Sequence, residues 1–497
     1  MGLRRARAIL LVSMLVLGAG CSTVVNSAKQ KEPMVGQFLA GNVPTALSLA
    51  QKKHSKTTGT GDELVWLLEC GSLLFYEGKY EEALNAFRRC EDIIAEYDER
   101  ALISLRDTGS EALTVLANTN ALPYRGWCRD RVALGIYKAL SYLGAGNEVA
   151  FRAQVKRLRE EHQKIMEDYQ KFFDAEEEKL AEEKEKNQEI VKKANSMDFL
   201  NDEKNSKYNE SMKETERVAH RGYGNFLNPA SLFLSGLALL RDGVWDNARI
   251  EFERLYEALP DNPYVRQYYV TALRRAGHEI PSELGNVEEF PFPLERDCVY
   301  VLYAHDRTAT LDQMSLYFPL IIAWPICVFH SELLPRLTVR ADGNSYDALP
   351  LADMDGIFAQ EYTRRMPGQL TRTLISALIK EAAFIATMHA LDGGGNRRHN
   401  QRVSGTQELV KLATAATWKT YQVIFNTADT RCWNFLPKEI CLTQLPMPAN
   451  RTLTFDGSVA AGRVAESVQI PENYGSAIIY VNAMTPANIR YQMFPLR

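Results

Sequence analysis

The sequence of 497 residues predicts a multidomain protein, with an α-helical repeat domain at residues 21–285 and an α+β domain at residues 286–497. Three observations predict this fold class. Two stretches of the first half share one spacing of glycine, alanine and aromatic residues, and a charged stretch at 150–221 has the charge spacing of a helix. Strand-like segments then begin at Cys298. With 46% hydrophobic and 24% charged residues, the composition is that of a globular protein with buried cores.

The N-terminus resembles the signal peptide of bacterial lipoproteins. The apolar run Ala8–Ala19 follows a basic start and is shorter than the roughly 20 residues needed to span a bilayer. In "LVLGAGCST", Cys21 directly follows small residues, as in a lipobox. The resemblance implies removal of residues 1–20 and a lipid on Cys21 that binds the membrane, and Ser22 is similar to the outer-membrane sorting pattern, facing the periplasm or the cell surface. The alternative is a plain secretory signal with an incidental cysteine.

The two matched stretches of the first half are "CGSLLFYEGKYEEALNAF" and "SGLALLRDGVWDNARIEF". Their shared positions are Gly71, Gly78, Tyr80, Ala83 and Phe87 in the first, and Gly236, Gly243, Trp245, Ala248 and Phe252 in the second. This pattern resembles the tetratricopeptide repeat (TPR), a helix–turn–helix unit of about 34 residues. Small residues allow the two helices to cross closely, the second glycine begins the turn, and the aromatic residues fill the groove. Generic amphipathic hairpins are the alternative and would give nearly the same architecture.

The stretch at 150–221 is interpreted as a charged helical insertion between the repeats. Opposite charges at helical neighbour spacing, such as Glu182 and Lys186, predict a long solvated helix with one apolar stripe. An exposed helical arm is favoured over a coiled-coil arm for a partner, because no sustained heptad is present. The polar residues 196–221 are expected to be loosely ordered.

The second half alternates strand-like segments with two expected helices. Strands are expected from Cys298 to about Met354, with Asp342 and Gly343 as a hairpin turn. Helices are expected over Gln369–Leu391 and 407–425, separated by a glycine-rich loop, and strands return up to residue 484. This order predicts a sandwich- or barrel-like α+β domain.

Searches for reaction chemistry yield no catalytic residue, cofactor or metal site, because no known nucleophile, phosphate-binding or zinc motif is present. His305 and Asp306 are interpreted as hydrogen-bonded loop residues after a strand. Besides Cys21 the chain has seven cysteines, an odd number that favours buried thiols, with a Cys432–Cys441 bridge as the alternative. The net charge of −4 gives no reason to expect nucleic acid as a partner.

Three segments resemble an uncharacterised family of bacterial lipoproteins with a TPR-like N-terminal half and an α+β C-terminal half. They are "YFPLIIAWP", "ADMDGIFAQEYTRRMPGQLTRTLISALIKEAAFIA" and "ADTRCWNFLPKEICLTQLPMPANRTLTF". The resemblance implies no activity, and its motifs are sharpest at Arg372, Asp429, Thr430, Arg431 and Trp433. A structural interpretation is favoured over a binding one: Asp429 and Arg431 form a local polar bracket, and Trp433 is buried beneath it, against the helix that contains Arg372.

These features predict a lipid-anchored envelope scaffold that binds protein partners through a groove of its TPR-like repeats. An enzyme acting on peptidoglycan or another glycan is the alternative, with Asp353, Asp355 and Glu361 as its candidate acids. A position at a helix start explains Asp353 and Asp355 without any reaction. A regulator of cell-wall synthesis is the third possibility, and it differs from the scaffold only in the identity of its partner.

Overall fold

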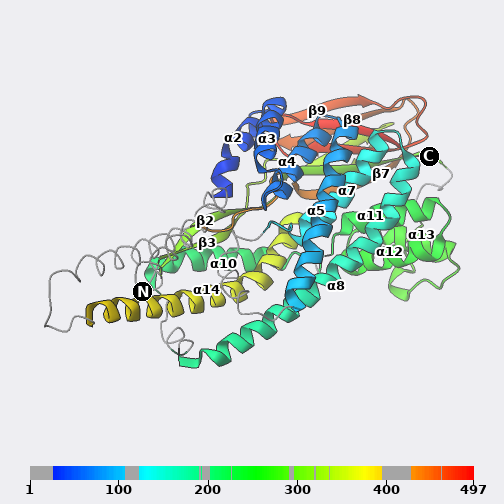
Figure 1. The fold of residues 1–497 in the computed structure, drawn as a ribbon. Coiled ribbons are helices and arrows are strands. Elements are labelled where there is room, and N and C mark those ends of the chain that lie inside the picture. Colours follow the sequence, from blue (N-terminus) through cyan, green and yellow to red (C-terminus); the bar gives the residue numbers. More distant parts are fainter. Residues whose placement is uncertain are drawn as a thin grey trace.

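The computed structural model describes residues 26–106, 123–189, 192, 202–224, 227–289, 296–317, 321–334, 336–393, 427–459 and 462–496. Within these ranges, helices dominate the first part, and strands with the long helix α14 (Met354–Gly393) make up the second (Figure 1). The expected order of a helical part followed by an α+β part is therefore confirmed. Among the described residues, no helix combines the length and apolarity that crossing a bilayer requires. Cys21 and the helix expected at 407–425 lie outside the described residues.

The helices of the first part stack as hairpins in chain order, each contacting the next. The pairs are α2 (Ser27–Leu39) with α3 (Val43–Thr57), α4 (Glu63–Tyr76) with α5 (Tyr80–Arg106), α7 (Cys128–Gly144) with α8 (Glu148–Lys186), and α11 (Pro229–Arg241) with α12 (Trp245–Ala258), followed by α13 (Pro263–Arg275). A glycine with positive φ follows the first helix of each pair: Gly41, Gly78, Gly146 and Gly243. Glycine suits this position because it adopts the left-handed conformation without a steric penalty.

The two matched stretches form the α4–α5 and α11–α12 hairpins. The rings of Phe87 and Phe252 lie fully buried against Gly71 and Gly236. A Cβ atom at Gly236 would lie 2.8 Å from the Phe252 ring, and one at Gly71 would lie closer still to Phe87. The alanines Ala83 and Ala248 are fully buried in the same hairpins, and Tyr80 and Trp245 are the first residues of α5 and α12.

The charged stretch begins as the outer half of a hairpin and not as a separate arm. Phe151, Val155 and Leu158 of α8 are buried, whereas its last turns are mostly exposed. The expectation of loose order is wrong over much of 196–221, because η3 (Glu203–Asn205) leads into helix α10 (Ser206–Ala219). Tyr208 and Val218 give this polar helix a buried side. Helix α10 packs against α14 (Met354–Gly393).

The described strands of the second part form three sheets. The five-stranded sheet has the order β11 (Arg490–Leu496), β10 (Ser476–Ala483), β1 (Cys298–Arg307), β7 (Pro437–Pro446), β6 (Leu349–Asp353). The four-stranded sheet has the order β5 (Asn344–Asp347), β4 (Arg336–Ala341), β8 (Thr452–Val459), β9 (Gly462–Gln469), and β2 (Thr310–Tyr317) pairs with β3 (Ile321–Val328). Strand β1 is parallel to β10 and antiparallel to β7. As expected, Asp342 and Gly343 form the β4–β5 turn, both with positive φ.

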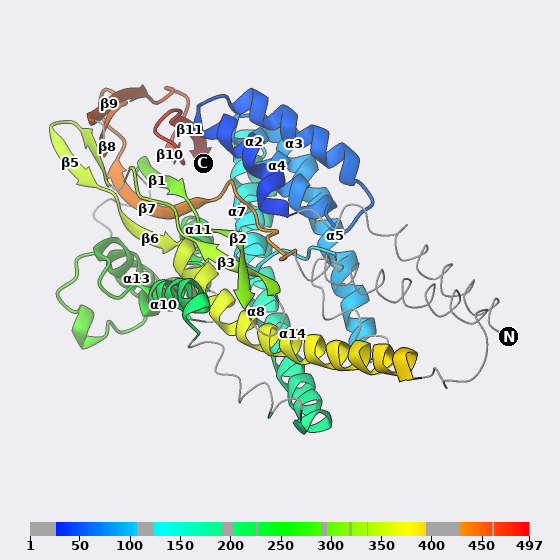
Figure 2. The same ribbon diagram turned by 90° about the vertical axis from the view of Figure 1, so that its left-hand side faces the viewer.

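The five-stranded sheet is buried on both faces. Val299 and Val301 of β1 belong to a core shared with the four-stranded sheet. Tyr300 and Leu302, which alternate with them, belong to a second core shared with the helices. Figure 2 shows these layers from the side: β5, β8 and β9, then β1 and β7, then α4 and α7.

Two elements of the second part differ from the sequence-based expectation. Helix α14 begins at Met354, at the helix start expected beside Asp353 and Asp355, and it continues through Pro367 into the helix expected from Gln369, because it packs against α7, α8 and α10. This packing outweighs the local cost of a proline inside a helix. Strand β11 was not expected at all, since its alternating pattern is short and contains Pro495.

The close helix crossings give a direct test of the hairpin packing. Gly71→Ala is expected to lower the free energy of unfolding by about 1–3 kcal/mol, because the added Cβ overlaps the buried Phe87 ring. The matched control is Gly36→Ala in α2, where a Cβ meets nothing within 4 Å and is expected to stabilise by about 0.5–1 kcal/mol. Urea denaturation measures both, and equal stabilities for the two variants would contradict the crossing.

Candidate functional site

An irregular stretch of chain runs between the helices and the sheets, directly before β7. We call residues 428–436 the junction segment. It contains the motif residues Asp429, Thr430, Arg431 and Trp433, and most of its side chains are buried. Because a buried irregular segment cannot satisfy its own backbone, its polar groups need partners from elsewhere.

Trp433 is the central apolar residue of the junction segment. Its ring lies 5.6 Å from that of Tyr137 and 6.3 Å from that of Phe87, measured between centroids, and its indole N–H donates to Ser72 at 3.1 Å. Trp433 is fully buried, as expected, and these partners lie on α4, α5 and α7. Arg372 of α14 lies 2.7 Å from Glu176 of α8. The slot for the indole is provided by α4, α5 and α7, so Trp433 joins the second part of the chain to the first.

A buried ion pair supports the junction segment from the side of the helices. Lys31 of α2 and Glu69 of α4 are 2.8 Å apart and almost fully buried. The Glu69 carboxylate also accepts the backbone N–H groups of Asn434 and Phe435, at 2.9 and 3.3 Å, and Lys31 donates to the carbonyl of Cys432. A buried ion pair needs such additional hydrogen bonds to offset its desolvation.

Arg129 of α7 forms a second buried connection. Its guanidinium donates to Thr308 and to the carbonyl of Ala309, both at 3.0 Å, and pairs with Asp130 at 3.1 Å. It also donates to the carbonyl of Trp433 at 3.4 Å. One fully buried side chain thus joins an inner helix, the β1–β2 connection and the junction segment.

The remaining motif residues fix the start of the junction segment. As expected, Arg431 pairs with Asp429, at 2.7 Å, and it also pairs with Asp62 at 3.0 Å. The Thr430 hydroxyl donates to Asn26 at 2.9 Å and accepts the backbone N–H of Ala28 at 3.1 Å. The Arg431 guanidinium holds the pKa of Asp429 below its usual range despite burial. These contacts are those of a structural clamp.

The three candidate acids of the glycan-hydrolase alternative contact different parts of the structure. Asp353 accepts the N–H of Gly356 at 2.8 Å and pairs with Arg221 at 2.9 Å. Asp355 accepts a hydrogen bond from the N–H of Ala309, in the β1–β2 connection, at 2.6 Å. Glu361 accepts one from the N–H of Cys128 at 2.7 Å. Burial raises the pKa of Asp353 to about 6 and that of Glu361 to about 7. Asp353 also lies directly opposite Glu439 in the pairing of β6 with β7, but the described residues do not show a cleft between these two carboxyls.

His305 and Asp306 are hydrogen-bonded, as expected, but they are buried at the end of β1 and not in a loop after it. The His305 Nδ1 atom lies 3.0 Å from Asp306, and its Nε2 atom lies 3.2 Å from Glu439 and 3.7 Å from the Cys441 sulfur. Burial lowers the pKa of His305, but hydrogen bonds to Asp306 and Glu439 outweigh it and raise the pKa to about 9. We call His305, Asp306, Glu439 and Cys441 the His305 group. The sequence analysis did not predict that these four side chains come together.

The seven cysteines within the described residues are all buried and free. The alternative of a Cys432–Cys441 bridge is therefore wrong. Cys432 lies in the junction segment, and Cys441 lies beside His305 on β7. The two side chains belong to different cores: Cys432 lies in the core shared with the helices, and Cys441 lies in the core shared with the four-stranded sheet.

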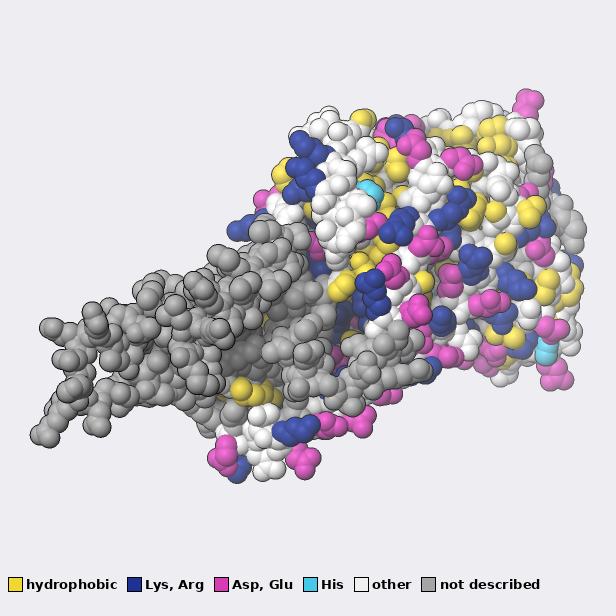
Figure 3. All heavy atoms as spheres, in the orientation of Figure 1, with side chains coloured by type: hydrophobic (Ala, Val, Ile, Leu, Met, Phe, Trp, Pro, Cys, Tyr) yellow, Lys and Arg dark blue, Asp and Glu magenta, His cyan; other side chains and the backbone are white. Residues whose placement is uncertain are grey.

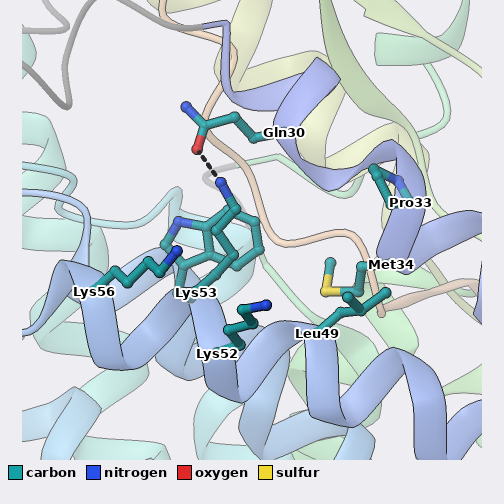
Figure 4. Close-up of a pocket in the computed structure, with 8 residues that line it drawn as sticks. Gln30, Pro33, Met34, Leu49, Lys52, Lys53 and Lys56 are labelled. Carbon is teal, nitrogen blue, oxygen red and sulfur yellow. Dashed lines mark hydrogen bonds between the residues drawn. The ribbon is translucent and has the colours of Figure 1, made fainter.

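A basic pocket lies on the outside of the first hairpin (Figure 4). Its cavity of about 250 Å³ is lined by Gln30, Pro33 and Met34 of α2, by Leu49, Lys52, Lys53 and Lys56 of α3, and by Trp66 of α4. Lys53 donates to Gln30 at 3.2 Å, and its ammonium lies 5.8 Å from the Trp66 ring. Three lysines around an apolar floor suit an anionic group.

An acidic groove lies on the outer side of the helical layer, between α5 and α8. Its cavity of about 240 Å³ has an apolar floor that includes Ile94, Leu134 and Ile165. We call it the outer groove. Its carboxylates are Glu91, Asp98, Glu161 and Asp168, and its basic residues are Arg131 and Lys164. Asp98 pairs with Arg131 and Arg125, both at 2.8 Å, and Glu91 pairs with Lys138. On the described part of the face drawn in Figure 3, basic and acidic side chains are intermixed.

Comparison of the chain with protein-family models, with curated proteins and with solved structures finds no match. The resemblance to a lipoprotein family therefore stays a prediction from the sequence. Function has to be argued from the junction segment, the His305 group and the two surface cavities.

Proposed function

We propose that this protein is a lipid-anchored scaffold of the bacterial envelope that binds protein partners through TPR-like hairpins. The positive-φ glycines after α2, α4, α7 and α11 and the two matched glycine–phenylalanine crossings support a TPR-like assignment. The candidate acids have structural roles, so a binding function is favoured over hydrolysis of a glycan. If the partner is an enzyme of cell-wall synthesis, the proposed scaffold would act as a regulator of that enzyme.

The binding surface proposed here is the outer groove, and not the inner side of the stacked helices. All residues of α4 are buried, and α7, α11 and α13 contact strands of the five-stranded sheet. The inner side on which many stacked-helix proteins bind their partners is thus covered by the chain's own sheet and junction segment. The groove between α5 and α8 combines an apolar floor with carboxylates: Asp98 and Glu91 are paired with Arg131 and Lys138, and Glu161 and Asp168 add further acidic groups from α8. This observation carries the proposal, and it favours a partner segment with apolar residues beside lysine or arginine.

The basic pocket supports the proposed anchor. Three of the residues that line the pocket lie on α2. Asn26, directly before α2, is five residues beyond Cys21, so the chain between them spans at most about 18 Å. A lipid on Cys21 would therefore hold the α2–α3 hairpin close to the membrane surface. Lys52, Lys53 and Lys56 would then face anionic phospholipid headgroups, with about 1 kcal/mol for each lysine near the surface.

The anchor is tested by Cys21→Ser. We expect the wild-type protein to incorporate a fatty-acid analogue and to fractionate with membranes, and the variant to lose both, because the thiol is the acylated atom. Cys70→Ser is the matched control, since Cys70 is buried in α4 and should leave labelling unchanged. Labelling that persists in Cys21→Ser would refute the lipid assignment.

The binding surface is tested by a photo-crosslinking residue placed in living cells at Ile165, on the floor of the outer groove. We expect a crosslinked protein adduct at Ile165 that is lost with Glu161→Lys, because the partner is held by the groove carboxylates. The control position is Val149, also on α8, whose side chain is 81% exposed but lies outside the groove. Equal adducts at both positions, or none at Ile165, would contradict the proposed surface.

A further inference from the structure

We propose that His305, Glu439 and Cys441 bind one divalent transition-metal ion of the zinc class. Among the described residues, these three offer one ligand atom each, a ring nitrogen, a carboxylate oxygen and a sulfur, all within 4.8 Å of one another. Nitrogen, oxygen and thiolate sulfur are the ligands that zinc takes in proteins. This inference goes beyond the scaffold proposal and does not depend on it.

The sheet itself brings the three ligands together. In the antiparallel pairing of β1 with β7, His305 lies opposite Glu439 and Tyr303 lies opposite Cys441. Because residues two apart on a strand share a face, Glu439 and Cys441 both point to the face of His305. The ligands therefore come from two adjacent central strands, and the backbone ladder fixes their spacing.

The distances between the ligand atoms fit a tetrahedral ion. The His305 Nε2 atom is 3.2 Å from the Glu439 oxygen and 3.7 Å from the Cys441 sulfur, and the sulfur is 3.6 Å from that oxygen. Zinc–nitrogen and zinc–oxygen bonds of about 2.0 Å and a zinc–sulfur bond of about 2.3 Å give edges of about 3.3 Å and 3.5 Å in a tetrahedron. The observed edges agree with these to about 0.2 Å, so the three atoms are spaced as ligands of one ion would be.

The second nitrogen of His305 is held as it is in established metal sites. Its Nδ1 atom lies 3.0 Å from the Asp306 carboxylate, which in turn accepts the N–H groups of Leu333 and Leu334, at 2.9 and 3.3 Å. A carboxylate at the far nitrogen orients a metal-binding histidine and raises its basicity. Asp306 adopts a φ of 51°, an uncommon conformation for a residue other than glycine, and it is this backbone that places the carboxylate beside the ring.

The charges around the site favour a cation. Asp306, Glu439 and the Cys441 thiol converge on a single imidazole. The nearby basic residues have other partners: Arg221 pairs with Asp353, and Lys438 pairs with Asp355 and Glu332. The Glu439 side chain is 26% exposed, whereas that of His305 is 2% exposed. With three protein ligands and one side toward solvent, the site is of the open kind, with water as the fourth ligand.

Metal binding is tested with Co²⁺ on the full-length protein after treatment with a chelator. We expect one bound Co²⁺ per chain, visible bands of a four-coordinate ion and a thiolate-to-cobalt charge-transfer band. Cys441→Ser should remove the charge-transfer band, and Asp306→Asn should weaken Co²⁺ affinity by about 10- to 100-fold. The matched control is Cys298→Ser, a buried thiol on the same strand as His305 but in the core shared with the helices, which should leave the spectrum unchanged.

Glu439→Gln provides a second variant that tests the site without disturbing a fully buried side chain. We expect it to keep the wild-type circular dichroism and to lose the increase in melting temperature that Zn²⁺ gives the wild-type protein. Absence of bound Co²⁺, or a charge-transfer band that persists in Cys441→Ser, would overturn the assignment. In that case His305 is an imidazolium paired with Asp306 and Glu439, and the group only stabilises the sheet end.

Discussion

Burial of charge at the junction segment is the constraint on which the rest of the structure depends. Glu69 and Lys31 come from the helices, but their remaining hydrogen bonds come from Cys432, Asn434 and Phe435. Neither the helical part nor the sheet part can satisfy these groups alone, and an unpaired buried charge costs several kcal/mol. The same holds for Arg129, whose partners lie on both sides of the junction. The two parts are therefore expected to fold as one cooperative body.

This constraint decides which surfaces are free to bind. The sheet and Trp433 occupy the inner side of the stacked helices, whereas the basic pocket and the outer groove are lined by residues of the helices alone. The basic pocket is close to the proposed lipid anchor, and the outer groove lies between α5 and α8. The long helices α8 and α14, which are joined by Arg372 and Glu176, extend beyond the sheets in both ribbon views (Figures 1 and 2). The proposed scaffold thus presents its helical exterior to partners.

The sequence predicts what depends on local spacing. The Gly71–Phe87 hairpin and the Asp342–Gly343 turn follow from steric rules that act within a few residues. The continuation of α14 through Pro367 and the formation of helix α10 could not be predicted, because each depends on packing against the other helix. The place of Trp433 was missed because Ser72, its hydrogen-bond partner, is 361 residues away. The His305 group needs the pairing of β1 with β7, although a histidine ending an apolar strand and an E-x-C pattern on another were visible signals.

The central claim, that the junction segment unites the two parts, is tested most directly by amide hydrogen exchange on Trp433→Ala. Removing this fully buried indole should cost about 3–5 kcal/mol and should raise exchange by a similar factor in α4 and α7 and in β1 and β10, because they unfold together. Trp245→Ala, in the α11–α12 hairpin, is the control, and its effect should be largest near α12. Faster exchange in Trp433→Ala confined to residues 428–436, with α4 and β1 as protected as in the wild type, would contradict the account.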